Sequence, residues 1–328
     1  IAFHLGADEF TGTVSARGGA PGRQAGGAGT IYARYAGEAA GRVLIDNADT
    51  WGAYTPLTCE EPFDLTLARR AQVHGDPDLT LRSLVVETNT VLTHLKEQDG
   101  LKVVVAGDAT ISGTVHADGL GFPVGVDPGP GAGGQSSWAG SGAGHGGTGG
   151  TSRTGLPGGP AYGSQLEPTL RGSQGGSGSG GAGGHGGGAV RFVVGGTLTI
   201  DGSITANGLN GTANDSGGGS GGSVFVSTRA LAGAGSIRAD GGAGEWVDGG
   251  GGAGGRIALY RTASAFTGAL AANGAGGSGR GEDGTIYEST APSVLWMAPG
   301  DPWAFGTIAL EVATLTAESG PLTAEFSA

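Results

Sequence analysis

The sequence predicts an all-β protein: a parallel β-solenoid that carries a packed, polyglycine-II-like layer and ends in a short immunoglobulin-like β segment. Three observations lead to this prediction. Glycine supplies 75 of the 328 residues, whereas the helix formers Leu, Lys, Glu and Met are sparse. Strand-like stretches recur at a fixed spacing, and a glycine-rich tract follows the closing motif of each one.

The strand-like stretches define a repeat of 33 residues. Three of them, starting at residues 190, 223 and 256, align without gaps, so that Val193, Val226 and Leu259 correspond. Each closes on an apolar residue, any residue, Ala, a polar residue and Gly, and this motif also occurs twice earlier in the chain. The residues expected to form the repeating core are Val14, Val115, Ile204, Ile237, Leu270, Ala206, Ala239 and Ala272.

Within each copy apolar residues alternate with small or polar ones, which is typical of strands with one buried face. The segment from residue 43 to 115 contains less glycine but the same kind of pattern, for example "FDLTLARRAQVHG" and "LKVVVAGDATISGTVHADG". Such short strands cannot bury their apolar face alone, and repetition at a fixed length favours the stacked rungs of a solenoid over a sandwich of hairpins.

The glycine-rich tracts occupy a fixed corner of each predicted rung. They cover residues 119–188, 208–222, 241–255 and 274–284. Extended strands without side chains can approach closely and hydrogen-bond through their backbones, which would offset the entropy lost on ordering them. The alternative is that the tracts are flexible loops on the same solenoid.

A longer repeat divides the chain. The start, "IAFHLGADEFTG", matches "IALYRTASAFTG" near the end, so that Phe10 corresponds to Phe266 and Ile31 to Ile286. Residues 1–42 are therefore predicted to be the tail of a preceding unit, 43–288 one glycine-rich solenoid unit, and 289–328 a partial immunoglobulin-like module or strand-donating tail. We expect tandem units in a longer parent chain, with any secretion signal upstream of the first residue.

Composition argues against several classes of protein. The net charge of -12, without any cluster of Lys and Arg, argues against a nucleic-acid partner. The sequence contains no apolar run of about 18 residues that could span a membrane. Cys59 is the only cysteine, which excludes an internal disulfide and a cysteine-based metal site.

Several motifs resemble those of very large, glycine-rich, repetitive bacterial surface proteins of the adhesin type. They include "GTIYARY", "ATISGTVHADGLGFP", "GAGHGGTGG" and "GGAGGHGGGAVRFVVGG", and the resemblance covers about residues 1–288. It implies an extracellular or cell-surface location and a structural or adhesive role, for example in a fibre or filament. It brings no catalytic residues. Head-to-tail self-association, lateral packing in a fibre and contacts with surface glycans are the partners we expect.

Aromatic residues and histidines within the glycine-rich tracts are the first candidate site residues. Trp138, Tyr162 and Trp246 are placed to stack on a sugar ring, or alternatively to pack on the glycine surface. His145 and His185 lie in similar contexts and either share a metal ion or hydrogen-bond to, or stack on, the glycine layer.

A polar position precedes the closing glycine in all five copies of the motif. Its residues, which either form a ladder that binds a cation or sit in a left-handed turn, are Arg17, Asp118, Asn207, Asp240 and Asn273. We predict no cofactor and no metal site; the alternative is calcium, because residues 240–250 have a faint similarity to calcium-binding repeats. No pair of carboxylates recurs at the rung spacing beside a basic residue, so we predict no enzymatic activity. The alternatives are a carbohydrate-binding or carbohydrate-cleaving solenoid and a phage or secretion-apparatus fibre.

Overall fold

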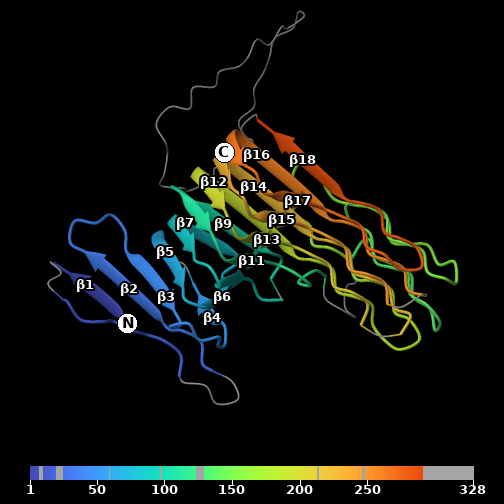
Figure 1. Ribbon diagram of the computed structural model, residues 1–328, viewed down its shortest axis with the longest axis horizontal. Helices are drawn as coiled ribbons and strands as arrows, with labels where there is room; N and C mark the ends of the chain where they lie inside the picture. Colours follow the sequence, from blue (N-terminus) through green and yellow to red (C-terminus); the bar gives the residue numbers. More distant parts are fainter. Residues whose placement is uncertain are drawn as a thin grey trace, which may run out of the picture. The chain divides into compact units, whose positions relative to one another are not determined.

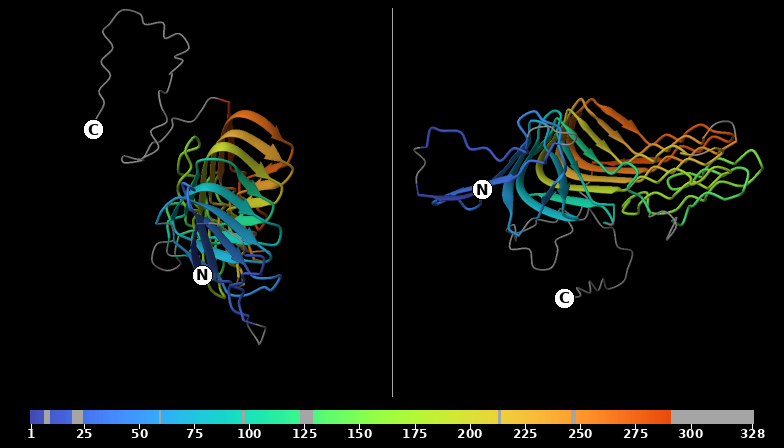
Figure 2. Two further views of the ribbon diagram at one scale, coloured as in Figure 1. Left: turned by 90° about the vertical axis from the view of Figure 1, so that its left-hand side faces the viewer. Right: turned by 90° about the horizontal axis from the view of Figure 1, so that it is seen from below.

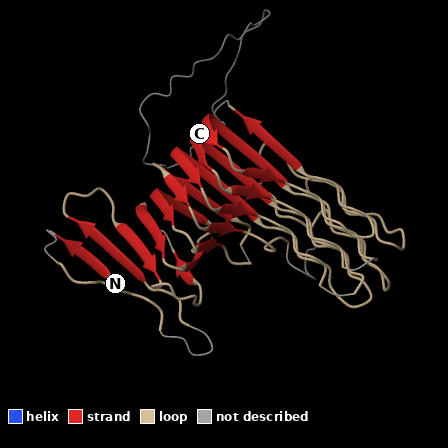
Figure 3. Cartoon of the chain, in the orientation of Figure 1, coloured by secondary structure: helices blue, strands red, loops and turns tan. Residues whose placement is uncertain are grey.

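The computed structural model describes residues 1–290 apart from residues 7–9, 20–24, 59, 97, 123–128, 213 and 246–247. As predicted, this part of the chain is all-β, without a helix (Figure 3). It therefore offers no helical segment that could span a lipid bilayer. The chain divides into Ile1–Ser293 and Val294–Ala328. The predicted immunoglobulin-like or strand-donating segment, 289–328, lies outside the described residues except for its first two.

The described strands form two sheets (Figure 1). Sheet A has, in spatial order, β1 (Ala2–Leu5), β2 (Thr30–Tyr35), β3 (Arg42–Asp46), β5 (Phe63–Ala68), β7 (Asp78–Val86), β10 (Ala109–Ile111), β12 (Ala189–Ile200), β14 (Ser223–Gly233), β16 (Arg256–Phe266) and β18 (Thr285–Ser289), with β9 (Leu101–Val105) between β7 and β12. Sheet B has β17 (Ala269–Ala271), β15 (Ser236–Arg238), β13 (Ser203–Thr205), β11 (Thr114–His116), β8 (Val91–Thr93), β6 (Gln72–Gly75) and β4 (Thr55–Leu57).

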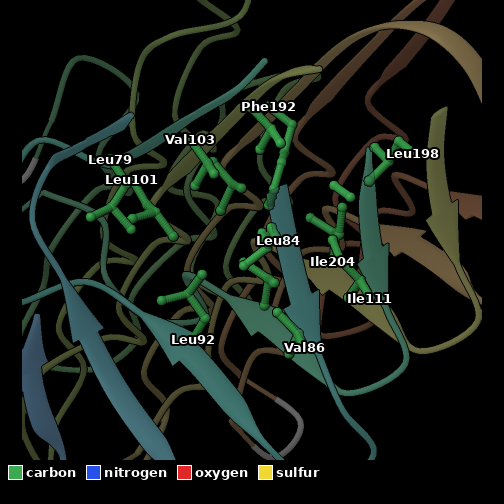
Figure 4. Close-up of a cluster of buried hydrophobic side chains, with 14 of the residues drawn as sticks. Leu79, Leu84, Val86, Leu92, Leu101, Val103, Ile111, Phe192, Leu198 and Ile204 are labelled. Atoms are coloured by element: carbon green, nitrogen blue, oxygen red, sulfur yellow. The ribbon is translucent and has the colours of Figure 1, made fainter. Parts of the chain in front are cut away.

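Paired strands run parallel in both sheets, except that β2 and β3 are antiparallel. After each of β11, β13 and β15 the chain leaves through a glycine-rich segment before it returns to sheet A, and these segments extend together to one side of the strands (Figure 2). Apolar side chains that face each other across the two sheets form one core, in which Leu92, Phe192 and Leu198 are fully buried (Figure 4).

The pairings in sheet A close into a ring of four strands at one place, because β9 and β10 each pair with both β7 and β12. β9 pairs with the first part of β12, from Val190 to Val194, and β10 pairs with its end, from Leu198 to Ile200. The ring therefore arises because β9 and β10 together fill one position between β7 and β12. The strand at this position is interrupted, whereas β7 and β12 are each continuous.

The predicted repeat positions lie in register in sheet B. Val115, Ile204, Ile237 and Leu270 pair in succession across β11, β13, β15 and β17. The first three are fully buried, and Leu270, in the last strand of the sheet, packs against the core while partly buried. The three repeat alanines, Ala206, Ala239 and Ala272, are also buried.

The fifth copy of the motif does not join this stack. Val14 is half-buried and lies in no strand. Its segment precedes the antiparallel pairing of β2 with β3, whereas sheet B consists only of strands that follow that pairing. The prediction that Val14 belongs to the same repeating core is therefore wrong, because the segment pairs with no strand of sheet B.

The ungapped alignment is wrong by one residue in sheet A. Phe192, and not Val193, pairs with Val226, which pairs with Leu259. An irregularity between Val194 and Thr197 then shifts the register. Since a shift of one residue moves a side chain to the opposite face of a strand, Phe192 enters the core and Val193 does not, and the bulge absorbs the extra residue.

Candidate functional site: the glycine lattice and its histidine–arginine cluster

The glycine-rich segments hydrogen-bond to one another through their backbones, and we call residues 129–188, 206–222, 239–255 and 272–284 the glycine lattice. In residues 217–222, successive amides donate to three different neighbouring segments, and amides three residues apart donate to the same one. The donor–acceptor pairs are Gly217–Gly176, Gly218–Gly250, Gly219–Leu209, Ser220–Ser173, Gly221–Ala253 and Gly222–Ala206.

Residues 250–255 follow the same rule. Their pairs are Gly250–Gly140, Gly251–Gly279, Gly252–Gly242, Ala253–Ala143, Gly254–Glu282 and Gly255–Ala239, with N···O distances between 2.7 and 3.0 Å. An extended helix with three residues per turn makes no internal hydrogen bonds and directs its amides outward in three directions. Each segment can therefore bond to several neighbours at once, unlike a β-strand, which has only two.

Glycine is required where these backbones approach most closely. A Cβ atom on Gly217 would lie 1.9 Å from the carbonyl oxygen of Ser141, and one on Gly142 would lie 1.8 Å from that of Gly251. Both obstacles are backbone atoms that cannot rotate away. The close approach therefore selects glycine at these positions.

His145 is fully buried within the lattice. Its Nδ1 lies 2.8 Å from the carbonyl oxygen of Gly221, and its ring packs against that of Tyr162 at a centroid distance of 4.6 Å. Because a carbonyl only accepts, Nδ1 must carry the proton. Nε2 has no hydrogen-bond partner among the described residues. The predicted hydrogen bond between a histidine and the glycine layer is thus confirmed for His145.

Burial keeps His145 neutral. It lowers the pKa of the imidazole from about 6.5 to about 4, against the opposing effect of the hydrogen bond to Gly221, and the positive charge of Arg256 lowers the pKa further. His185 has different neighbours: Leu209 donates to its carbonyl oxygen, and its pKa is lowered by burial and by Lys96. The histidine that sequence reasoning grouped with His145 therefore has a different environment.

Arg256 connects the lattice to sheet A. Its guanidinium is buried and donates to the carbonyl oxygens of Tyr162 (2.8 Å) and His145 (3.2 Å) and to the hydroxyl of Thr285 (3.1 Å). Burial lowers the pKa of this group. The arginine thus joins two strands of sheet A, β16 and β18, to a segment about 100 residues away in sequence.

The repeated polar position forms a ladder across successive copies of the repeat. The Oδ1 atom of one residue accepts the amide of its counterpart in the next copy: Asp118 from Asn207 (2.6 Å), Asn207 from Asp240 (2.8 Å) and Asp240 from Asn273 (2.8 Å). None of these four residues has a positive φ. The predicted left-handed turn is wrong, because the side chains instead accept hydrogen bonds from the next copy of the repeat. Arg17, the fifth predicted member, is exposed and has no carboxylate or amide side chain to take part.

Of the predicted sugar-stacking residues, Trp138 and Tyr162 lie in the described part of the chain, and they differ in exposure. Trp138 is 74% exposed. Tyr162 is half-buried: its hydroxyl donates to the carbonyl oxygen of Arg171 (2.6 Å) and accepts from Ser173 (2.8 Å). Trp246 lies outside the described residues. Tyr162 thus agrees with the alternative that the aromatic residue packs on the glycine surface.

Two exposed aromatic residues that sequence reasoning missed lie close to β4 and β6. Tyr54, 36% exposed, stacks in parallel on His74 at 4.2 Å, and Arg70 lies over the ring of Trp51, 47% exposed, at 5.8 Å. Arg256 was also missed. The sequence did contain a signal for Arg256: it is charged, whereas the neighbouring copies of the repeat have small residues at this position.

No group of three or more His, Cys, Asp or Glu side chains in the described part of the chain is placed to hold a metal ion. Comparisons of the chain with protein-family models, with curated proteins and with solved structures give no match.

Proposed function

We propose that this chain is a non-catalytic structural segment of an extracellular surface fibre or large adhesin, and that its described part is a parallel β-solenoid with a polyglycine-II-like layer. The observation that carries this proposal is the glycine lattice. Its segments use the three-residue hydrogen-bond period in several directions at once. A segment with that pattern resists force applied across the glycine lattice as well as force applied along the direction in which the strands pair.

Two further features support a mechanical role. The core is continuous from β3 to β17, because strands in successive rungs pair with one another in both sheets. The polar ladder and Arg256 then join rungs that are far apart in sequence. Rungs that each bond to their neighbours through the core, the ladder and the lattice form a stiff rod.

Electron microscopy and fibre diffraction of the protein on its native surface test this proposal. We expect filaments with a meridional reflection near about 4.8 Å, the spacing of paired strands, and a longer axial repeat that corresponds to one unit. Isolated short particles without axial order would overturn it.

Carbohydrate binding is a second candidate, favoured by the exposed pairs at Trp51 and Tyr54. Exposed aromatic faces beside cationic or imidazole groups are suited to stacking on a sugar ring and to hydrogen bonding with its hydroxyls. Binding to an immobilised glycan panel tests this role. Trp51→Ala should abolish binding while Trp138→Ala should not, and equal binding by both variants would contradict it.

A further inference from the structure

β2 and β18 are equivalent strands of two copies of the long repeat. Ala2 of β1 pairs with Tyr32 of β2, and Ala258 of β16 pairs with Tyr287 of β18, at the positions that the two copies place in correspondence. The two copies therefore have the same register as well as similar sequences.

Ring contacts agree with this equivalence. His4 and Tyr32 have centroids 5.6 Å apart at an interplanar angle of 53°, and Tyr260 and Tyr287 have centroids 5.6 Å apart at 52°. Each pair joins the two strands of its copy at corresponding positions. The pair of strands β1 and β2 is thus a second instance of the pair β16 and β18.

The two copies differ at the outer edge of the second strand. β2 is followed by a short connection, residues 36–41, and pairs there with antiparallel β3, with Ile31 opposite Leu44 and Tyr32 opposite Val43. β18 is the last strand of sheet A, and nothing in the described ranges pairs with its other edge. Ile286 at this edge is 43% exposed.

The free edge of β18 has donors in the same places as β2. Thr285 donates its amide to the carbonyl oxygen of Gly255, toward β16, so that the amides of Ile286 and Glu288 point away from β16. In β2, Tyr32 donates to Ile1, toward β1, so that Ile31 and Ala33 direct their amides toward β3. Unpaired amides along an exposed strand are a template for another strand.

We infer that the free edge of β18 is a docking site for an antiparallel strand, supplied by the β3 segment of a second copy of this chain. In that complex β18 takes the place of the second copy's own β2, which otherwise pairs with this edge of β3, while β5 keeps the other edge. The register of β2 with β3 places Ile286 opposite Leu44, and Glu288 opposite Arg42, of the second copy. Glu288 already pairs with Arg261 in its own chain, and the arriving Arg42 adds a second cation to this carboxylate. The inference deepens the proposed assembly of units and rests on it.

Docking in this register would place the cores of two successive units on opposite faces of sheet A. Tyr32 packs against the core that contains Val43. Its equivalent Tyr287 pairs with Ala258, whereas the flanking residues Ile257 and Leu259 face the core of their own unit. Tyr287 therefore lies on the outside of its unit, and successive units joined this way would place their second sheets on opposite sides of sheet A.

A labelled peptide of residues 37–47, which contains the β3 sequence, tests the inference by fluorescence anisotropy with the full 328-residue chain. We expect saturable binding that a scrambled peptide does not show. Ile286→Pro removes one outward amide but none of the amides directed toward β16, and should weaken binding about tenfold. Ile286→Ala, which keeps the amide, is the matched control and should change binding less than about threefold.

Absence of binding, or equal binding by Ile286→Pro and Ile286→Ala, would overturn the inference. Far-ultraviolet circular dichroism of both variants checks that the fold is retained. The result is separable from the microscopy above: peptide binding without filaments overturns the fibre but keeps the edge site, whereas filaments without peptide binding overturn the edge site alone.

Discussion

Gly217 offers the most direct test of the glycine lattice. Gly217→Ala places a Cβ atom 1.9 Å from the carbonyl oxygen of Ser141 and 2.5 Å from its carbonyl carbon. The matched control is Gly276→Ala, because a Cβ atom on Gly276 meets nothing within 4 Å and this residue is not in the left-handed region. Both residues belong to glycine-rich tracts of the lattice, so the two variants change composition equally.

The expected loss in free energy of unfolding for Gly217→Ala follows from the backbone shift that the new Cβ atom requires. Ordinary carbon–oxygen contacts begin near about 3.4 Å, so the backbone of residues 141 and 217 must separate by more than an ångström, which disturbs the hydrogen bonds on both segments. We expect a loss of about 3 kcal/mol for Gly217→Ala, at the upper end of overpacking in a close-packed interior. Gly276→Ala should be neutral or stabilise by about 0.5 kcal/mol through reduced entropy of the unfolded chain.

Thermal unfolding followed by circular dichroism measures the difference. Gly217→Ala should lower the midpoint by about 6–12 °C, and Gly276→Ala should leave it within about 2 °C of the unsubstituted protein. Hydrogen exchange gives an independent reading, since the amides of residues 217–222 all donate to backbone carbonyls and should exchange slowly. Equal midpoints for the two variants, together with exchange of these amides within seconds, would refute the lattice and favour flexible loops.

Three further outcomes are expected. Because burial lowers the folded-state pKa of His145 to about 4 from about 6.5, this residue alone should contribute about 3 kcal/mol to the fall in the free energy of unfolding as the pH is lowered across that window; urea titrations should show a smaller loss for His145→Asn, and an equal loss would contradict the assignment. Asp240→Ala removes the acceptor of the Asn273 amide and should cost about 1 kcal/mol, whereas Asp240→Asn, which keeps the acceptor, should cost less; equal losses would argue against the ladder. Trp138→Ala should leave stability within about 0.5 kcal/mol by the same titration, since the side chain is 74% exposed, and a larger loss would reveal packing of this residue.

The repeat shows how far sequence reasoning reaches. Identity of spacing placed Ile204 and Ile237 in the same position of successive rungs, and they pair in register. Spacing alone could not place Phe192 opposite Val226, because the bulge that shifts the register leaves the total length of the repeat unchanged. A β-bulge can leave the number of residues per repeat unchanged and still move a side chain to the other face of its strand.

The repeated polar position was likewise only partly predictable from the sequence. Recurrence of Asp and Asn before glycine was visible in the sequence, but both a turn and a ladder explain such residues. Only the parallel pairing of β13 with β15 brings the Oδ1 atom of Asn207 within 2.8 Å of the amide of Asp240. The contact joins residues in different copies of the repeat, so no local propensity predicts it.

The sequence by itself determined the all-β class, the length of the repeat and the positions of the glycine-rich tracts, because period-two alternation and glycine content are local properties of the chain. Tertiary structure alone decided that Arg256 braces the carbonyl groups of His145 and Tyr162, that backbone contacts select glycine at Gly217, and that β3 enters antiparallel to β2. These features depend on which segments lie beside one another in space, and spacing along the chain does not fix that arrangement.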